Sequence, residues 1–175
     1  MTQSRTPGRT PYHIVVTGVS GVGKSTVAQT LASRLGLDSA EGDAFHPQAN
    51  IDKMSAGQPL DDADRMPWLR SLAGWLRDRD AEGRSTVMTC SALKRRYRDV
   101  LRSGAPATCF VQLVGDQATL RERMASRQHF MPPALLASQF DALEPLKDDE
   151  AGVTVDVTEE PDQVVANIVE RLGLG

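Results

Sequence analysis

Several features that mark particular protein classes are scarce in this sequence. Its 175 residues include only two cysteines, Cys90 and Cys109, and both lie inside apolar runs. They therefore predict buried, reduced thiols instead of a disulfide framework, and a cytoplasmic location. The formal net charge of −3 and the pI near 5.6 leave no basic excess. Because nucleic acids and membrane surfaces are polyanionic, this balance argues against either as a partner and favours a small-molecule ligand.

Long apolar runs and flexible linkers are also missing. The opening stretch "MTQSRTPGRTPY" carries basic residues without an apolar run behind them, so it resembles neither a secretory signal nor a membrane span. We expect residues 1–11 to form a disordered lead-in. Since no Gly/Ser-rich or Pro-rich segment divides the remainder, residues 12–175 are expected to fold as a single domain.

The pattern that is present alternates strands with helices. Apolar, β-branched runs predict strands at 13–18, 85–92, 107–115 and 152–157, with a weaker one in 37–43. Helical spacing predicts helices at 25–36, 47–56, 64–83, 91–104, 116–127, 132–146 and 161–173. Such alternation is typical of an α/β three-layer sandwich with a parallel sheet, which binds ligands beyond the carboxyl ends of its strands.

The clearest local signal is "GVSGVGKS", residues 18–25, a phosphate-binding loop pattern between a predicted strand and a predicted helix. Its glycines allow backbone N–H groups to turn toward phosphate oxygens, and the helix start adds a positive dipole end. The expected nucleotide-binding residues are Gly18, Val19, Ser20, Gly21, Val22, Gly23, Lys24, Ser25 and Thr26. Lys24 would bridge the β- and γ-phosphates of ATP, and Ser25 would offer its hydroxyl to Mg²⁺. The alternative is a glycine-rich turn with an incidental lysine.

Two further absences narrow the class of nucleotide-binding protein. The sequence has no Asn-Lys-x-Asp motif, which would read guanine in a regulatory GTPase. The strand at 85–90 ends in Cys90 and Ser91, so it supplies no acidic residue for the metal side of the site. In "EGDAFHP", Glu41 and Asp43 follow the weak second strand and become the candidate carboxylates, unless they only form a solvated turn.

The order of four segments resembles one family. These are "GVSGVGKST", "EGDAFHPQANIDKMSAGQPLDDADRMPWL", "CSALKRRYRDVLR" and "HFMPPALLASQFDALE". Together they are similar to gluconokinases of the small phosphate-loop type, which are relatives of shikimate and adenylate kinases, from about residue 13 to the last helix. The resemblance implies a nucleoside-monophosphate-kinase-like fold with a mobile lid. It also implies Mg²⁺-dependent transfer of the ATP γ-phosphoryl group to the 6-hydroxyl of D-gluconate, and in some relatives a homodimer.

The resemblance also implies roles for the two carboxylates. Asp43 matches the aspartate that faces the acceptor, so it is expected to orient and deprotonate the sugar hydroxyl. Glu41 would then lie near Mg²⁺, through a water or directly. Relatives commonly carry aspartate at this position, so Glu41 departs from the pattern by one methylene.

Gluconate carries a carboxylate and a row of hydroxyls, so its site should contain a cation and several neutral donors. His46 either binds this substrate or caps the helix that Pro47 begins. Arg65 is one candidate cation. Lys94 and Arg98, four residues apart on a predicted helix, are two more, with a solvated basic face as the alternative.

A third cationic set lies in "RERMASRQHF", residues 121–130, which matches the lid segment of similar kinases. Of Arg123 and Arg127, one is expected to flank the adenine while the other approaches the transferring phosphate, unless both only pair with Glu122 and solvent. His129 is a candidate substrate or lid contact. Two other functions stay open: a kinase of another small sugar acid or polyol such as shikimate, and a nucleotide-binding regulatory module without turnover.

Overall fold

The computed structural model describes residues 10–126 and 133–174, and the side chains of 123–126 and 133–135 lie outside the description. Five parallel strands form one sheet in the order β2-β3-β1-β4-β5. They are β1 (His13–Thr17), β2 (Asp38–Glu41), β3 (Thr86–Thr89), β4 (Thr108–Val114) and β5 (Gly152–Asp156). The predicted parallel α/β sheet is confirmed, and the weakly signalled second strand is real.

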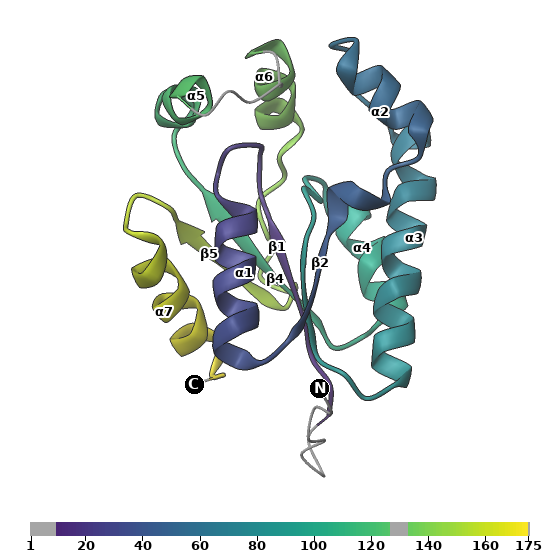
Figure 1. The fold of residues 1–175 in the computed structure, drawn as a ribbon, viewed down its shortest axis with the longest axis vertical. Coiled ribbons are helices and arrows are strands. Elements are labelled where there is room, and N and C mark those ends of the chain that lie inside the picture. Colours follow the sequence, from purple (N-terminus) through teal and green to yellow (C-terminus); the bar gives the residue numbers. More distant parts are fainter. Residues whose placement is uncertain (1–9, 127–132, 175) are drawn as a thin grey trace.

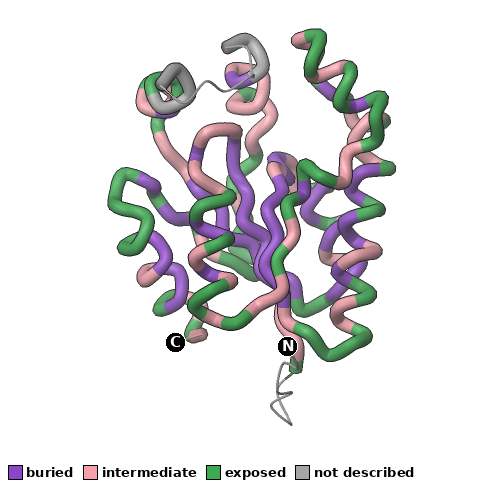
Figure 2. The backbone as a smooth tube through the Cα atoms, viewed as in Figure 1, coloured by how far each residue is buried: buried purple, intermediate pink, exposed green. Residues whose placement is uncertain are grey.

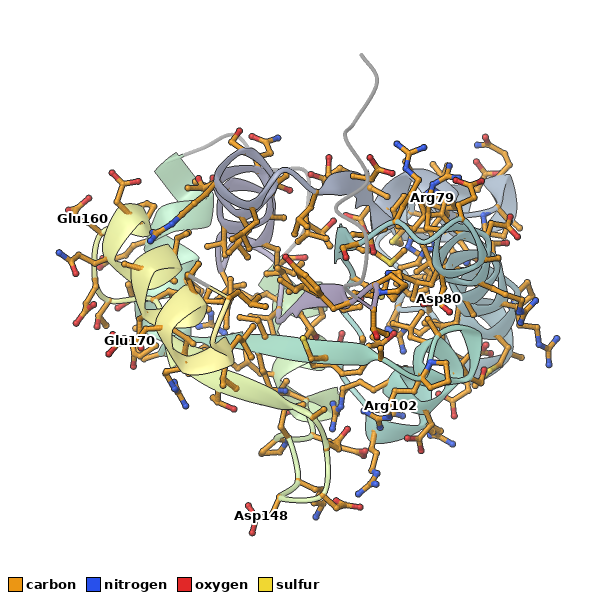
Figure 3. All side chains as sticks on the ribbon, turned by 90° about the horizontal axis from the view of Figure 1, so that it is seen from below. Arg79, Asp80, Arg102, Asp148, Glu160 and Glu170 are labelled. Carbon is orange, nitrogen blue, oxygen red and sulfur yellow. The ribbon has the colours of Figure 1, made fainter. Side chains whose placement is uncertain are left out.

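Helices cover both faces of this sheet, as Figures 1 and 3 show. The helices are α1 (Lys24–Leu35), α2 (Gln48–Ser55), α3 (Asp62–Ala81), α4 (Arg95–Gly104), α5 (Gln117–Ser126), α6 (Pro133–Ala142) and α7 (Pro161–Leu172). On one face, α1 and α7 pack against Ile14, Val16 and Val111; on the other, α3 and α4 pack against Val15 and Phe110. Successive side chains of β1 thus alternate between two hydrophobic cores, one on each face of the sheet, and the whole strand is buried (Figure 2).

Two helices differ at their ends from the predicted ranges. The helix predicted at 91–104 begins only at Arg95, because Ala92 has a positive φ of 32° and the Thr17 hydroxyl donates to the carbonyl of Ser91. The helix predicted to run to 146 ends at Ala142. Helical periodicity cannot reveal the first of these differences, since the bend is imposed by a hydroxyl from a distant strand.

The end of the sheet away from the phosphate loop is closed by buried polar contacts. His13 is fully buried, with Nδ1 2.8 Å from the Thr86 hydroxyl and Nε2 2.9 Å from an Asp80 carboxylate oxygen. Figure 3 shows this end from below, with Asp80 on α3 and Arg102 on α4. Across the described part of the chain, no helix is long and apolar enough to cross a bilayer.

Candidate active site

The phosphate loop connects β1 to α1 through three glycines with positive φ. Gly18, Gly21 and Gly23 have φ values of 147°, 81° and 101°, which side chains rarely tolerate. A Cβ on Gly18 would also lie 2.7 Å from the backbone oxygen of Leu113. The loop therefore requires these glycines, and the helix dipole of α1 points its positive end at the enclosed space.

Lys24 opens α1 and turns its side chain back into the loop. Its Nζ donates to the carbonyl oxygens of Gly18 at 2.9 Å and Val19 at 3.0 Å. Desolvation lowers the pKa of Lys24, and the neighbouring carboxylates of Asp43 and Glu41 oppose that shift. The ammonium group is thus held inside the phosphate loop, facing the two candidate carboxylates.

Glu41 lies beside Ser25, although the two residues are sixteen positions apart. The Ser25 hydroxyl donates to Glu41 Oε2 at 3.1 Å, and the Thr89 hydroxyl donates to the same oxygen at 2.6 Å. The reason is topological, because β2 and β3 are adjacent parallel strands and end together, with Glu41 paired to Thr89. A hydroxyl and a carboxylate give the oxygen donor set that Mg²⁺ prefers, and Mg²⁺ sites commonly use one or two carboxylates plus substrate phosphates. The described residues contain no cluster of three or more His, Cys, Asp or Glu side chains able to hold a metal.

Asp43 is carried by a short 3-10 helix, η1 (Gly42–Phe45), that is tied down on both sides. The Gly42 N–H donates to the Thr89 hydroxyl at 3.2 Å, and the Trp68 indole donates to the Gly42 carbonyl at 2.7 Å. A Cβ on Gly42 would lie 2.1 Å from the backbone oxygen of Thr89, so only glycine allows the two backbones to approach this closely. The backbone next to Asp43 is therefore fixed, while its carboxylate is 85% exposed.

His46 follows η1 and stacks on Trp68, with ring centroids 4.1 Å apart and planes inclined by 16°. Its Nδ1 lies 3.2 Å from the Asn50 amide nitrogen, and its Nε2 lies 3.9 Å from Asp43. Burial lowers the pKa of His46, Asp43 raises it and Arg65 lowers it, so the net shift is downward. The N-cap residue of α2 is Pro47, which forms no side-chain cap bond, and the contact between His46 and α2 is with the Asn50 side chain. Both alternatives for His46 stay predictions.

These side chains line one cavity of about 170 Å³ next to the phosphate loop. Its lining includes Lys24, Asp43, His46 and Arg65. The sequence predicted all four as site residues, from separate segments of the chain. Figure 1 shows α2 and α6 on either side of the region above the carboxyl ends of the strands. Arg65 donates to the Tyr97 hydroxyl at 3.1 Å, and no carboxylate of the described residues lies within ion-pair distance of it. The cavity thus contains two cations beside one exposed carboxylate.

Comparisons with known proteins agree with this geometry. A family model described as an AAA domain matches residues 14–146. The chain is 47% identical to a gluconokinase of Gluconobacter oxydans (strain 621H) over 173 residues, covering 98% of this chain and 97% of the relative. The chain belongs to the gluconokinase family.

Solved structures support the same membership. A gluconokinase from Sinorhizobium meliloti 1021 is 45% identical, with a TM-score of 0.84, covering 95% of this chain and 94% of that one. A sugar kinase from Janibacter sp. HTCC2649 is 48% identical, with a TM-score of 0.91, covering 94% of this chain and 96% of that one. The family resemblance seen in the sequence is therefore confirmed.

The predicted substrate-binding role of Arg98 in this gluconokinase-family chain is wrong. Arg98 is fully buried and forms a two-pronged pair with Glu150, through Nε at 2.8 Å and Nη2 at 3.0 Å. Its Nη1 donates to the Glu144 carbonyl at 3.0 Å. Lys94 is the N-cap residue that precedes α4, whereas Arg98 lies within the helix and points into the core toward Glu150. Lys94 lies 3.6 Å from Asp62 and is not among the cavity-lining residues, so its substrate role stays a prediction.

Three predicted residues cannot be placed. Arg127 and His129 lie outside the described residues, as does the side chain of Arg123. Their expected roles at the lid of this gluconokinase-family chain stay predictions. The expected disordered lead-in likewise falls almost entirely on residues 1–9, which are not described.

The structure also adds residues that the sequence reasoning missed. Gln139 on α6 accepts a hydrogen bond from the Ser20 N–H at 2.7 Å, and it lines the cavity. Thr89 orients Glu41, as described above. A second cavity of about 310 Å³ lies between the phosphate loop and the segment from Val157 to Pro161. The rule that ligands bind beyond the carboxyl ends of strands could have indicated this segment, since it directly follows β5.

Proposed function

We propose that this protein transfers the γ-phosphoryl group of ATP to the 6-hydroxyl of D-gluconate, giving 6-phospho-D-gluconate and ADP. The observation that carries the proposal is the cavity of about 170 Å³ beside the phosphate loop, which holds Lys24, Asp43 and Arg65 together. Phosphoryl transfer depends on positioning and charge neutralisation more than on covalent catalysis. A half-buried lysine, an exposed carboxylate and an arginine that pairs with no carboxylate of the described residues supply those functions.

In the proposed step, the 6-hydroxyl oxygen of gluconate attacks the γ-phosphorus while the bond to the β,γ-bridging oxygen breaks. ADP leaves with the electron pair of that bond. The hydroxyl proton passes to the Asp43 carboxylate, which is free to accept it because it is 85% exposed and makes no closer ion pair than 3.9 Å to His46. Lys24 stabilises the negative charge that spreads over the phosphate oxygens. Arg127 retains its predicted role at the transferring phosphate.

The acceptor is recognised at the other side of the cavity. Arg65 is positioned to pair with the gluconate carboxylate, because a guanidinium offers two parallel donors to a carboxylate. His46, with a lowered pKa, is neutral near pH 7 and can exchange hydrogen bonds with a sugar hydroxyl. The predicted substrate role of His129 fits the same group of neutral contacts.

Ser25 and Glu41 would hold Mg²⁺, with Thr89 fixing the orientation of the carboxylate. The ion would neutralise charge on the β- and γ-phosphates. The second cavity, between the phosphate loop and Val157–Pro161, would accept the nucleoside part of ATP, together with Arg123.

Two further parts of the proposal concern the location and the assembly of the protein. The two free cysteines, one buried and one half-buried, suit a reducing cytoplasm. A homodimer follows only from the family resemblance, and light scattering of the purified protein tests it.

The test of the function is ADP release by the purified protein with ATP and Mg²⁺, using gluconate, shikimate and sorbitol as acceptors. We expect kcat/KM for gluconate to exceed that for sorbitol by at least about 10³-fold, because a site built around a charged contact rejects an acceptor that lacks it. Shikimate keeps the carboxylate and tests whether the site selects the open-chain acid. Preferred use of shikimate or sorbitol would support the alternative kinases. An Asp43→Asn variant distinguishes a kinase from a regulatory module without turnover. In a kinase, the variant should bind ATP normally and lose about 10²–10⁴-fold in kcat.

A further inference from the structure

A hydrogen-bonded chain of three side chains leads from the surface to Arg65. The Tyr97 hydroxyl donates to Asp62 Oδ1, and Arg65 Nη1 donates to the Tyr97 oxygen at 3.1 Å. An arginine has no acceptor and an ionised carboxylate has no proton, so the direction of both bonds is fixed. Asp62 takes the hydroxyl proton, and the oxygen lone pairs of Tyr97 are therefore available to Arg65.

The elements that carry this chain are rigid. A capping box fixes the start of α3, because Asp61 accepts from the Asp64 N–H at 2.8 Å and Asp64 accepts from the Asp61 N–H at 3.0 Å. Asp62 and Arg65 lie in this first turn. Tyr97 is 1% exposed and belongs to α4, which packs so closely on α3 that a Cβ on Gly104 would lie 2.3 Å from the Ala73 oxygen.

The surrounding charges support the same arrangement. The Arg65 guanidinium carbon lies 5.4 Å from the centre of the Tyr97 ring, and Lys94 and Arg96 approach the same ring at 5.7 and 5.9 Å. Asp62 partly neutralises these cations, since Arg96 pairs with it at 2.5 Å. Of these three cations, Arg65 is the one that lines the cavity, so its charge is available to a group bound there.

We infer that Tyr97, oriented by Asp62, is a positioning residue that holds Arg65 in the geometry needed to pair with the carboxylate of the acceptor. The inference deepens the proposed function and rests on it. Tyr97 is not among the residues that line the cavity, and it reaches the site through Arg65. Its hydroxyl determines where the guanidinium points, and so affects acceptor binding without affecting the chemical step.

Tyr97→Phe tests this, because phenylalanine keeps the ring and its packing and removes only the hydroxyl. We expect the KM for gluconate to rise roughly tenfold, as for the loss of one hydrogen bond to a charged group, with kcat and the KM for ATP nearly unchanged. The matched control is Tyr12→Phe, which makes the same change at the opposite end of the sheet and should leave all three constants alone. Asp62→Ala should resemble Tyr97→Phe in its effect on the KM for gluconate.

A double-mutant cycle with Arg65→Ala separates positioning from general destabilisation. If Tyr97 acts through Arg65, adding Tyr97→Phe to Arg65→Ala produces no further rise in the KM for gluconate. Additive effects, or an unchanged KM in Tyr97→Phe, overturn the inference. Assays of the wild-type protein distinguish the failure of the proposed function from the failure of the Tyr97 inference. If the wild type phosphorylates a different acid, the gluconate assignment is refuted, and the double-mutant cycle is then measured with that acid. A wild type that uses only neutral acceptors overturns both.

Discussion

Removing Arg98 should destabilise the fold and leave the substrate site intact. Arg98 and Glu150 have fully buried side chains and share two hydrogen bonds. Arg98→Met fills a similar volume but leaves the Glu150 carboxylate without its main partner. Losing one member of a buried pair typically costs about 3–5 kcal/mol in the free energy of unfolding.

The remaining contacts set the lower end of that range. Glu150 would keep Arg102 Nη2 at 2.9 Å and the Lys147 N–H at 2.8 Å. We therefore expect a loss of about 3 kcal/mol, or a fall of about 1.5 M in the urea midpoint for a denaturant slope near 2 kcal/mol per M. Arg98→Met combined with Glu150→Leu should recover part of the loss, because the buried carboxylate is removed with its partner and Arg102 keeps its ion pair with Asp99.

Urea unfolding of the variants, followed by circular dichroism, provides the measurement, and Arg96→Met is the matched control. Arg96 is 57% exposed and pairs with Asp62 at the surface, so its removal should change the midpoint little. The KM for gluconate should stay near the wild-type value in Arg98→Met. An unchanged urea midpoint together with a much higher KM for gluconate would refute the reasoning and restore Arg98 as a substrate residue.

Three further predictions concern the same core and the metal side of the site. Burial by itself would raise the pKa of Glu150, but hydrogen bonds from Arg98, Lys147 and Arg102 outweigh it and lower the pKa from its usual 4.5 to about 2. This stabilisation is present above about pH 4.5 and is lost as the pH falls toward 2, so Glu150→Gln should flatten the pH dependence of urea unfolding in that window; an unchanged slope contradicts it. Thr89→Val removes the hydroxyl that orients Glu41 and should weaken Mg²⁺-dependent ATP binding about tenfold by calorimetry, whereas equal affinity would show that Glu41 needs no such support. Burial raises the pKa of the Cys90 thiol to about 12, so a thiol reagent at pH 8 should modify Cys90 only after unfolding; rapid labelling of Cys90 in the native protein, read by peptide mass spectrometry, would disprove this.

The sequence predicted the strands, most helices and the phosphate loop because each is encoded locally. Apolar runs identify β1, β3 and β4, and the glycine spacing from Gly18 to Gly23 specifies the loop. The direction of Arg98 could not be predicted, because it depends on Glu150, which is 52 residues away. Charge and helical spacing alone do not distinguish a buried ion pair from a solvated or ligand-binding cation.

The candidate site was predicted in part for the same reason. Asp43, His46 and Arg65 were nominated by residue type and family motif, and the fold brings them into one cavity. Thr89 and Gln139 were missed, since a threonine ending a strand and a glutamine on a helix have no distinctive local pattern. Their contacts with Glu41 and Ser20 arise only from strand order and from the placement of α6.

The position of the transferred phosphate tests the central claim most directly. The wild-type protein is incubated with ATP, Mg²⁺ and D-gluconate, and the product is examined by proton-coupled phosphorus NMR. Transfer to the 6-hydroxyl predicts a phosphomonoester coupled to the two protons of one primary carbon. A phosphoester coupled to a single proton, or ADP release without any sugar phosphate, would contradict the account.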